Sequence, residues 1–343
     1  MTSKEFAHLL GVSQSTVSRA LNNSPLISES RKAFIRLKAA EFGFELNSQA
    51  RSLKTNRTGT VGILFPRHFK SMNDNLMLTH LYDRIQKELI ASDHDIMTVY
   101  DYGENRGISA FERIIKRRKV DALIILRSEL SEREMDLIRE NNFPCVSMLL
   151  TGSQKKPLYY CLSDSRLGGE LAGDFFGGFP EFAMMYIGID EDPDESRNRC
   201  AGFRRGLAKH GRKLPAANVF SCGMSFASAY ELAGKMLPGL GENKTAVFAY
   251  NDIVALGIID AIREKGIAIP GRVQLIGMDD IPLAGWMRPH LSTLHIPVED
   301  MVPNACKLIR DLIEGNDMGD YRSMYQPTLI TRDTTLSRPS ARG

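Results

Sequence analysis

Hydrophobic residues follow two different spacings along this chain of 343 residues. In the first 45 residues they recur every three or four positions, which is the spacing of amphipathic helices. From Val61 onward, short apolar runs alternate with longer helical stretches. Alternation of strands and helices over such a length is typical of parallel sheets covered by helices. The pattern therefore predicts a small all-α head followed by an α/β body.

The head is expected to contain three short helices. Apolar spacing predicts the first over 3–10 and the second over 14–21, with Gly11 at the turn between them. A tight turn favours glycine there because glycine tolerates positive φ, and Ser13 is a good N-cap for the second helix. A third helix is predicted over 28–42. Two short helices joined in this way form a helix-turn-helix, whose second helix enters the major groove of DNA.

The predicted second helix has a polar outer face, formed by Gln14, Ser15, Ser18 and Arg19. A three-helix bundle without a DNA role is the alternative, but a purely structural helix has no need for this polar cluster. The net charge of the head also favours a DNA-binding role. Residues 1–58 hold nine Lys/Arg and four Glu, a net charge of +5, whereas the remainder carries −2. A basic head attracts a polyanion, although charge alone would also fit a solubilising terminus.

The body is expected to form two lobes, because about 270 residues are too many for one small sheet. Seven strands are predicted, over 61–65, 96–100, 122–126, 145–149, 184–187, 246–250 and 273–278. Helical patterns lie between them, among others over 76–92, 109–116, 131–141, 197–210, 225–237 and 253–265. In such folds ligands bind at the carboxyl ends of strands, and the cleft between two lobes is the default site.

Composition narrows the class of protein. With 43% hydrophobic and 25% charged residues, the chain is neither collagen-like, coiled-coil nor mostly disordered. No run of about 18 apolar residues predicts a membrane span, and the N-terminal residues lack the pattern of a signal peptide. The five cysteines are scattered without a CxxC motif, which argues against a zinc site or a disulfide framework. We expect a cytoplasmic protein without a metal or cofactor.

Two strings in the head are long and specific: G-V-S-Q-S-T-V-S-R-A-L-N from Gly11, and G-F-E-L-N-S-Q-A-R-S-L-K-T from Gly43. They resemble the DNA-binding head and linker of the lactose/galactose-repressor family of bacterial transcription regulators. The resemblance implies that Gln14 and Ser15 contact bases and that Arg19 contacts bases or backbone. It also implies phosphate contacts for Thr16 and Ser18.

The same resemblance implies a hinge helix within 46–58, which folds when a dimer sits on operator DNA. The hinge residues that would contact DNA are Asn47, Ala50, Leu53 and Lys54. Leu53 matches the wedge that enters the minor groove and kinks the duplex. The family usually has a proline where this chain has Leu46, so a preset φ is lost and we expect a less preorganised hinge.

The resemblance extends through the body, which in this family has a periplasmic-binding-protein-like fold: two α/β lobes joined by three crossovers. By position in the family's motifs, seven residues are expected to bind a small effector: Asn75, Arg127, Asp164, Arg199, Asn251, Asp252 and Asp279. Carboxylates, amides and a planar guanidinium suit a polyhydroxylated ligand such as a sugar. Two alternatives stay open: Asn251–Asp252 could cap the following helix, and Asp279–Asp280 could be a solvated loop.

Several cations near the expected cleft suggest an anionic effector, such as a sugar acid or phosphosugar. They are Arg67, His68, Lys70, Arg127 and Arg199. The alternative is that they are solvated surface cations, as most lysines and arginines are. Two departures from the family also bear on the ligand: Ser165 replaces a usual asparagine, and Met224 lies where an aromatic commonly floors the pocket.

Three classes of function remain: an effector-responsive DNA-binding repressor, a solute-binding transport protein and an α/β enzyme. The basic head opposes the second. No motif such as GxSxG, HExxH or GxGxxG supports an enzyme, and the glycines at 239–245 lack P-loop spacing. One head contacts only a half-site, so specificity for a pseudo-palindromic operator requires a homodimer.

The expected domains are a helix-turn-helix head over 1–45, a hinge helix and linker over 46–58, and an effector-binding and dimerisation body over 59–333. A short polar tail is expected over 334–343, and it lacks leucine heptads for a tetramer.

Overall fold

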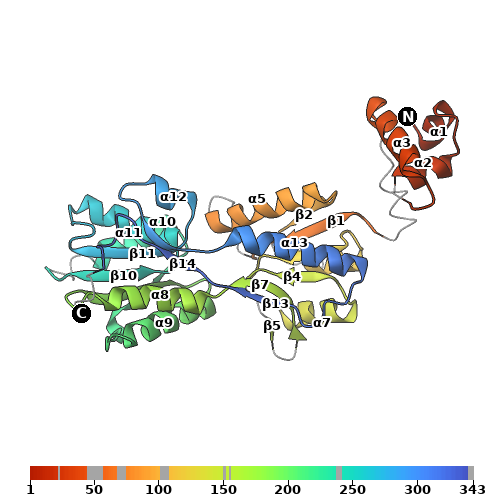
Figure 1. Cartoon of the computed structure of the whole chain (residues 1–343). Helices are drawn as coiled ribbons and strands as arrows, with labels where there is room; N and C mark the ends of the chain where they lie inside the picture. Colours follow the sequence, from red (N-terminus) through yellow and green to blue (C-terminus); the bar gives the residue numbers. More distant parts are fainter. Residues whose placement is uncertain are drawn as a thin grey trace.

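A computed structural model describes residues 1–21, 24–44, 57–67, 75–100, 108–149, 152–153, 156–236 and 242–338. Figure 1 shows a helical head set apart from a body of two α/β lobes that lie side by side. The predicted fold class, a small all-α head before a two-lobed body with parallel sheets, is confirmed.

The head consists of α1 (Ser3–Leu9), α2 (Gln14–Leu21) and α3 (Glu29–Glu41). Gly11 has φ +62°, as the predicted tight turn requires. Ser13 caps α2, because its Oγ accepts a hydrogen bond from the Thr16 amide at 3.1 Å. The small core is closed by the stacked rings of Phe6 and Phe44, whose centroids lie 4.2 Å apart. The predicted helix-turn-helix is therefore present.

The first lobe is built on a parallel sheet with strand order β13-β7-β4-β3-β1-β2. Its strands are β1 (Thr60–Leu64), β2 (Asp95–Val99), β3 (Ala122–Ile125), β4 (Cys145–Ser147), β7 (Tyr159–Ser163) and β13 (Arg322–Tyr325). A small hairpin joins β5 (Gly152–Ser153) to β6 (Lys156–Pro157). Helices α5 (Leu76–Ala91) and α13 (Val298–Glu314) cover one face, and α6 (Ala110–Lys116) and α7 (Glu132–Glu140) cover the other.

The second lobe has strand order β14-β12-β11-β10-β8-β9, parallel except for the antiparallel edge strand β14. Its strands are β8 (Ala183–Ile189), β9 (Val219–Cys222), β10 (Thr245–Ala249), β11 (Val273–Asp279), β12 (Ser292–His295) and β14 (Thr328–Ile330). Its helices are α8 (Ser165–Gly177), α9 (Pro193–Ala208), α10 (Phe226–Met236), α11 (Asp252–Glu264) and α12 (Pro282–Trp286), with a 3-10 turn over Ala216–Asn218.

The chain passes between the lobes three times: after β7, after β12 and after β13. The first and third crossovers touch, because the Asp164 amide donates to the Tyr325 carbonyl oxygen at 2.8 Å. Sites at the carboxyl ends of the strands in both lobes therefore face the same junction.

Helices α8 and α9 pack backbone against backbone. A methyl group on Gly169 of α8 would lie 2.1 Å from the carbonyl oxygen of Arg199, and one on Gly202 of α9 would lie 1.9 Å from that of Arg166. Only glycine permits such an approach. The pattern of strands and helices in the sequence does not predict α8, whose four glycines are poor helix formers.

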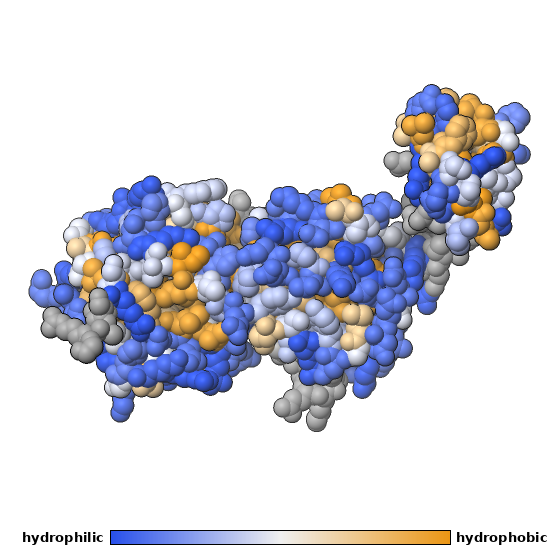
Figure 2. Space-filling view, viewed as in Figure 1, coloured by the Kyte–Doolittle hydropathy of each residue, from blue (hydrophilic) through white to orange (hydrophobic). Residues whose placement is uncertain are grey.

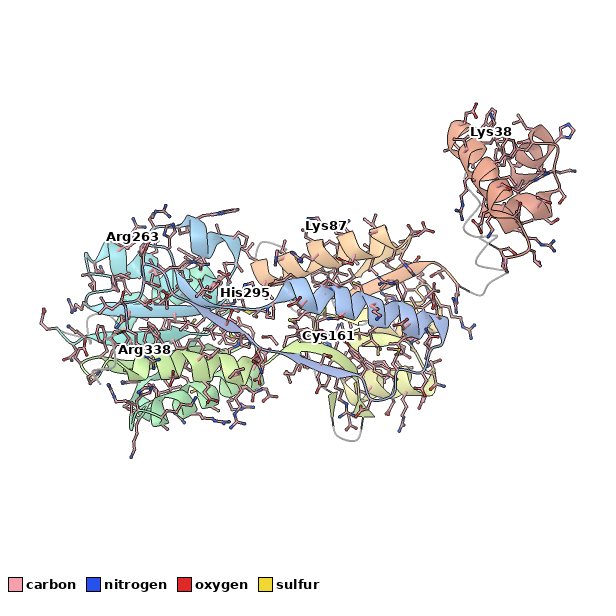
Figure 3. All side chains as sticks on the ribbon, viewed as in Figure 1. Lys38, Lys87, Cys161, Arg263, His295 and Arg338 are labelled. Atoms are coloured by element: carbon pink, nitrogen blue, oxygen red, sulfur yellow. The ribbon has the colours of Figure 1, made fainter. Side chains whose placement is uncertain are left out.

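The described part of the expected polar tail belongs to the second lobe. Thr334 is fully buried, and it exchanges hydrogen bonds with the backbone of Leu275 in β11. Arg338, labelled in Figure 3, donates to the carboxylate of Asp174 at 3.1 Å. The lobe therefore continues at least to residue 338, beyond the expected boundary at 333.

Candidate functional site

The outer face of α2 is polar and accessible. Gln14, Ser15 and Arg19 are exposed, Thr16 and Ser18 are half-buried, and Val17 and Ala20 point into the head core. The Ser13 hydroxyl lies 2.8 Å from both the Ser15 and the Thr16 hydroxyls, so these two side chains also complete the helix cap. The face has the donors and acceptors that reading base edges requires. Asn47, Ala50, Leu53 and Lys54 lie outside the described residues.

Side chains from the two lobes meet at the lobe junction. Ser128, which follows β3, hydrogen-bonds to the carboxylate of Asp192, which caps α9. Asn75 of the first lobe places its Nδ2 3.9 Å from Sδ of Met224 in the second. Both contacts join segments that follow strands, so the predicted effector site would lie at this junction.

Arg199 is the buried cation of this junction. Its Nη1 donates to the Tyr250 carbonyl oxygen, its Nε lies 3.3 Å from Glu195 Oε1, and its guanidinium stacks 4.1 Å from the Tyr250 ring centroid. Burial alone would lower the pKa of Arg199, but Tyr250, Glu195 and Asp279 together raise it above its usual range. The guanidinium therefore stays charged and is held in one orientation.

Asp279 shares this environment. It ends β11 with φ +119°, a backbone conformation that side chains other than glycine seldom adopt. Burial raises the pKa of Asp279 to about 7, because the attraction of Arg199 offsets only part of the loss of solvent. The alternative of a solvated loop is therefore wrong for Asp279, which is half-buried and whose carboxylate interacts with the buried guanidinium of Arg199.

The expected effector role of Asp252 does not fit its geometry. Its two carboxylate oxygens accept hydrogen bonds from the Thr293 hydroxyl and from the Ile281 amide, behind the end of β11. A methyl group on Gly277 would lie 2.3 Å from Oδ1, so the carboxylate is packed against the sheet. Asp252 is completely buried, and burial raises its pKa well above the usual range. Its contacts are those of a structural residue.

Three other expected effector residues cap helices. Asn75, Asp164 and Asn251 accept hydrogen bonds from the amides of Leu78, Leu167 and Val254, at 2.9–3.0 Å. The capping alternative is thus confirmed for Asn251. Capping uses only the acceptor oxygen of an asparagine, and the Nδ2 of Asn75 reaches Met224 across the junction. A cap and a ligand contact are therefore compatible for the asparagines.

Arg127 does not offer a free charge. Its buried guanidinium donates from Nη1 to Glu134 Oε1 at 2.9 Å and from Nε to the Phe65 carbonyl oxygen at 3.4 Å. Arg67 donates to the other oxygen of Glu134 at 2.9 Å. The two arginines converge on one carboxylate of α7 instead of on the expected anionic ligand. His68 and Lys70 lie outside the described residues.

Sequence reasoning missed several residues that shape the junction. Glu134 is visible in the sequence as the end of a capping box with Ser131, but nothing there pairs it with Arg127. Asp192 and Glu195 belong to an acidic run over 190–195, and Tyr250 ends a predicted strand. The acidic run is the signal in the sequence from which extra carboxylates near Arg199 could have been predicted.

Within the described residues, no helix is long and apolar enough to span a membrane. The same part of the chain contains no group of three or more His, Cys, Asp or Glu residues arranged to hold a metal ion.

Comparisons with known proteins agree with this architecture. The model of the periplasmic binding protein-like domain matches residues 177–335. The repressor PurR of Vibrio parahaemolyticus is 26% identical over 97% of this chain and 98% of its own length. The regulator GalR of Escherichia coli is 27% identical over 99% of this chain and 96% of its own length.

A solved structure of the lac repressor dimer, bound to operator and an anti-inducer, has the same fold. It aligns with a TM-score of 0.80 and 19% identity, over 98% of this chain and 99% of that one. With its helix-turn-helix head and its two lobes, the chain is similar over nearly its whole length to regulators of the lactose/galactose-repressor kind.

Proposed function

We propose that this protein is a DNA-binding transcriptional repressor whose affinity for its operator changes when a small molecule binds between the two lobes. One observation carries the proposal: a single chain joins an exposed polar face on α2 to a two-lobed body in which the buried Arg199 interacts with the charge of the half-buried Asp279 at the lobe junction. A transport protein has no use for the first feature. The protein is proposed to act in the cytoplasm and to catalyse no reaction.

The effector is proposed to be a neutral, hydroxylated molecule of the sugar class. Glu195 Oε1 lies 3.3 Å from Nε of Arg199, so the guanidinium is already matched by a negative charge. Arg67 and Arg127 are matched by Glu134. An anionic ligand would meet more carboxylates than unmatched cations, whereas hydroxyl groups donate to carboxylates and accept from the guanidinium.

A homodimer is proposed as the DNA-binding form. Ile90 of α5 is exposed, and Trp286 at the end of α12 is 73% exposed with Met287 beside it. Both helices lie along the upper edge of the body in Figure 1, and Figure 2 shows an apolar patch over α5 on an otherwise hydrophilic edge. Exposed aromatic and aliphatic side chains of this size are typical of an interface.

The DNA half of the proposal is tested by selecting bound fragments from a genomic library with the full chain. Arg19→Ala should weaken binding to the selected site at least about fivefold, since a good base contact contributes about 1–3 kcal/mol. Lys38→Ala is the matched control: it removes the same charge from the last turn of α3, where Lys38 pairs with Glu41. Equal losses for both variants would mean that α2 is not the recognition helix.

The effector half is tested by a thermal-shift screen of sugars, sugar acids, phosphosugars and purines. A ligand at 100 times its Kd should stabilise the protein by about 2.7 kcal/mol. Arg199→Lys should abolish that shift and the change in operator affinity, because the planar fork is lost. Arg197→Ala, on the exposed side of the same helix, should keep both. Unchanged ligand response in Arg199→Lys would place the effector elsewhere.

A further inference from the structure

His295 lies at the end of β12, directly before the second crossover, and is labelled in Figure 3 between the two lobes. Its Nδ1 lies 3.1 Å from Oδ2 of Asp280, and its Nε2 lies 2.9 Å from Oε1 of Glu299. Each ring nitrogen thus faces a different carboxylate.

The two carboxylates belong to different lobes. Asp280 directly follows β11 of the second lobe, and its other oxygen accepts a hydrogen bond from Arg332 at 2.6 Å. Glu299 is in the first turn of α13, which packs on α5 and the sheet of the first lobe. Only Ile296 and Pro297 separate His295 from that helix. One side chain therefore joins the lobes at a point about which they would have to rotate.

The number of N–H groups on the His295 imidazole decides whether it can hydrogen-bond to both carboxylates. A neutral imidazole has one N–H, so it can donate to only one carboxylate, while its other nitrogen faces the lone pairs of the second. An imidazolium donates to both. Burial would raise the pKa of Glu299, but the hydrogen bond from His295, a backbone hydrogen bond and the charges of His295 and Arg84 together lower it, so this carboxylate remains ionised. Both contacts are hydrogen bonds only when His295 carries two protons.

The contacts of His295 with Asp280 and Glu299, here called the His295 clamp, lie next to the proposed effector site. His295 is the register partner of Asp279 across β11 and β12, and Asp280 is the next residue in the chain. We propose that His295 is a proton-dependent positioning residue, which fixes the loop of Asp279 and Asp280 to α13 when doubly protonated and releases one lobe when it loses a proton. Its effect on effector binding rests on the proposed function, whereas the link between the lobes does not.

Other charged groups around the clamp have to be separated from His295. Arg332 acts on Asp280, and Arg84 and His80 of α5 act on Glu299. Burial lowers the pKa of His80, with Arg84 adding to the effect. Asp279 is a separate titrating group in the same pH range. A pH dependence of the whole protein would therefore be ambiguous, and the measurement has to be made at His295 itself.

The test uses the full chain without DNA or effector, so that its outcome is independent of the proposed function. The imidazole nitrogens of His295 are followed by nitrogen NMR between about pH 5 and 8, where histidine ordinarily changes charge. Hydrogen exchange is measured at the Met301 amide, which donates to Pro297 in the first turn of α13 at 3.1 Å. At the acidic end, both ring nitrogens should be protonated, and this turn should exchange about tenfold more slowly than in His295→Gln.

At the alkaline end, wild type and His295→Gln should exchange alike. At acidic pH, Glu299→Gln should lose the slow exchange of this turn just as His295→Gln does. Because glutamine has the same size as glutamate, this variant can replace His295→Gln if that one does not fold. Asp83→Asn breaks an exposed ion pair with Lys87 on α5 and is the control that should change nothing. A neutral imidazole with one N–H at about pH 5, or a difference from His295→Gln that does not vary with pH, would overturn the proposal.

Discussion

Replacing Gly202 by alanine tests the close contact of α8 and α9. The new methyl carbon would lie 1.9 Å from the Arg166 carbonyl oxygen and 3.0 Å from the Glu170 nitrogen. Since Cβ atoms essentially never approach closer than 3.0 Å, the helices must separate by about 1.1 Å along that line. Both obstacles are backbone atoms, so no side chain can rotate away to make room.

The cost follows from two opposing terms. Overpacking of a well-packed interface typically costs about 1–3 kcal/mol, and a blocked backbone contact belongs at the upper end. Alanine regains up to about 1 kcal/mol of helix propensity relative to glycine. We expect a net loss of about 2 kcal/mol, which lowers the melting temperature by about 4–8 °C for a lobe of this size.

The matched control is Gly234→Ala in α10, where an added methyl would meet no atom within 4 Å. That variant gains helix propensity without a clash, so it should be more stable by about 0.5–1 kcal/mol. Both are measured by calorimetry and by urea unfolding. If Gly202→Ala is stabilised like Gly234→Ala, the helices adjust freely and the reasoning is refuted. A displaced α9 should also weaken effector binding, because Arg199 lies one turn before Gly202.

Two further predictions concern buried charge. Arg127→Met should cost about 3 kcal/mol in urea unfolding, because Glu134 loses a buried partner. In a Glu134→Leu background the same Arg127→Met change should cost much less, because the carboxylate that Arg127 pairs with is gone, and additive losses would contradict the pairing. Asp279 holds its proton in the folded state up to about pH 7 but is ionised above about pH 4 when unfolded. Stability should therefore fall as the pH rises from about 4 to 7. Asp279→Asn should remove that part of the slope in unfolding experiments, whereas an unchanged slope would assign it to other groups.

Local chemistry explains which parts of the structure the sequence predicts. Gly11 and Ser13 act on neighbouring residues, so the turn and cap of α2 can be predicted from a few positions. Central strands such as β3 and β10, which are fully buried between two helix layers, can likewise be predicted from their apolar runs. Three of the four edge strands, β9, β13 and β14, are short and partly exposed, and they are not predicted, whereas the edge strand β2 is. Their pairing is decided by segments distant in the chain.

The candidate site is predicted less well, because partners decide the role of a polar side chain. Arg127 follows β3, where an effector-binding residue would be expected. Its guanidinium is nevertheless paired with the carboxylate of Glu134, in the first turn of the next helix. Asp252 is buried and Asp279 is half-buried, and both lie in motifs that resemble those of the family. Their backbone directions differ, and only Asp279 is close enough to Arg199 to interact with its charge. No pattern in one sequence encodes that direction.

The three crossovers have a consequence for the order in which the protein folds during synthesis. The core of the head uses only residues between Phe6 and Phe44, so it can form as soon as these leave the ribosome. Neither lobe can do so: the first lobe waits for α13 and β13, and the second waits for β14 and Thr334. A nascent chain therefore carries a finished recognition helix well before either lobe is complete. DNA contact by a growing chain would escape effector control until the last strands are in place.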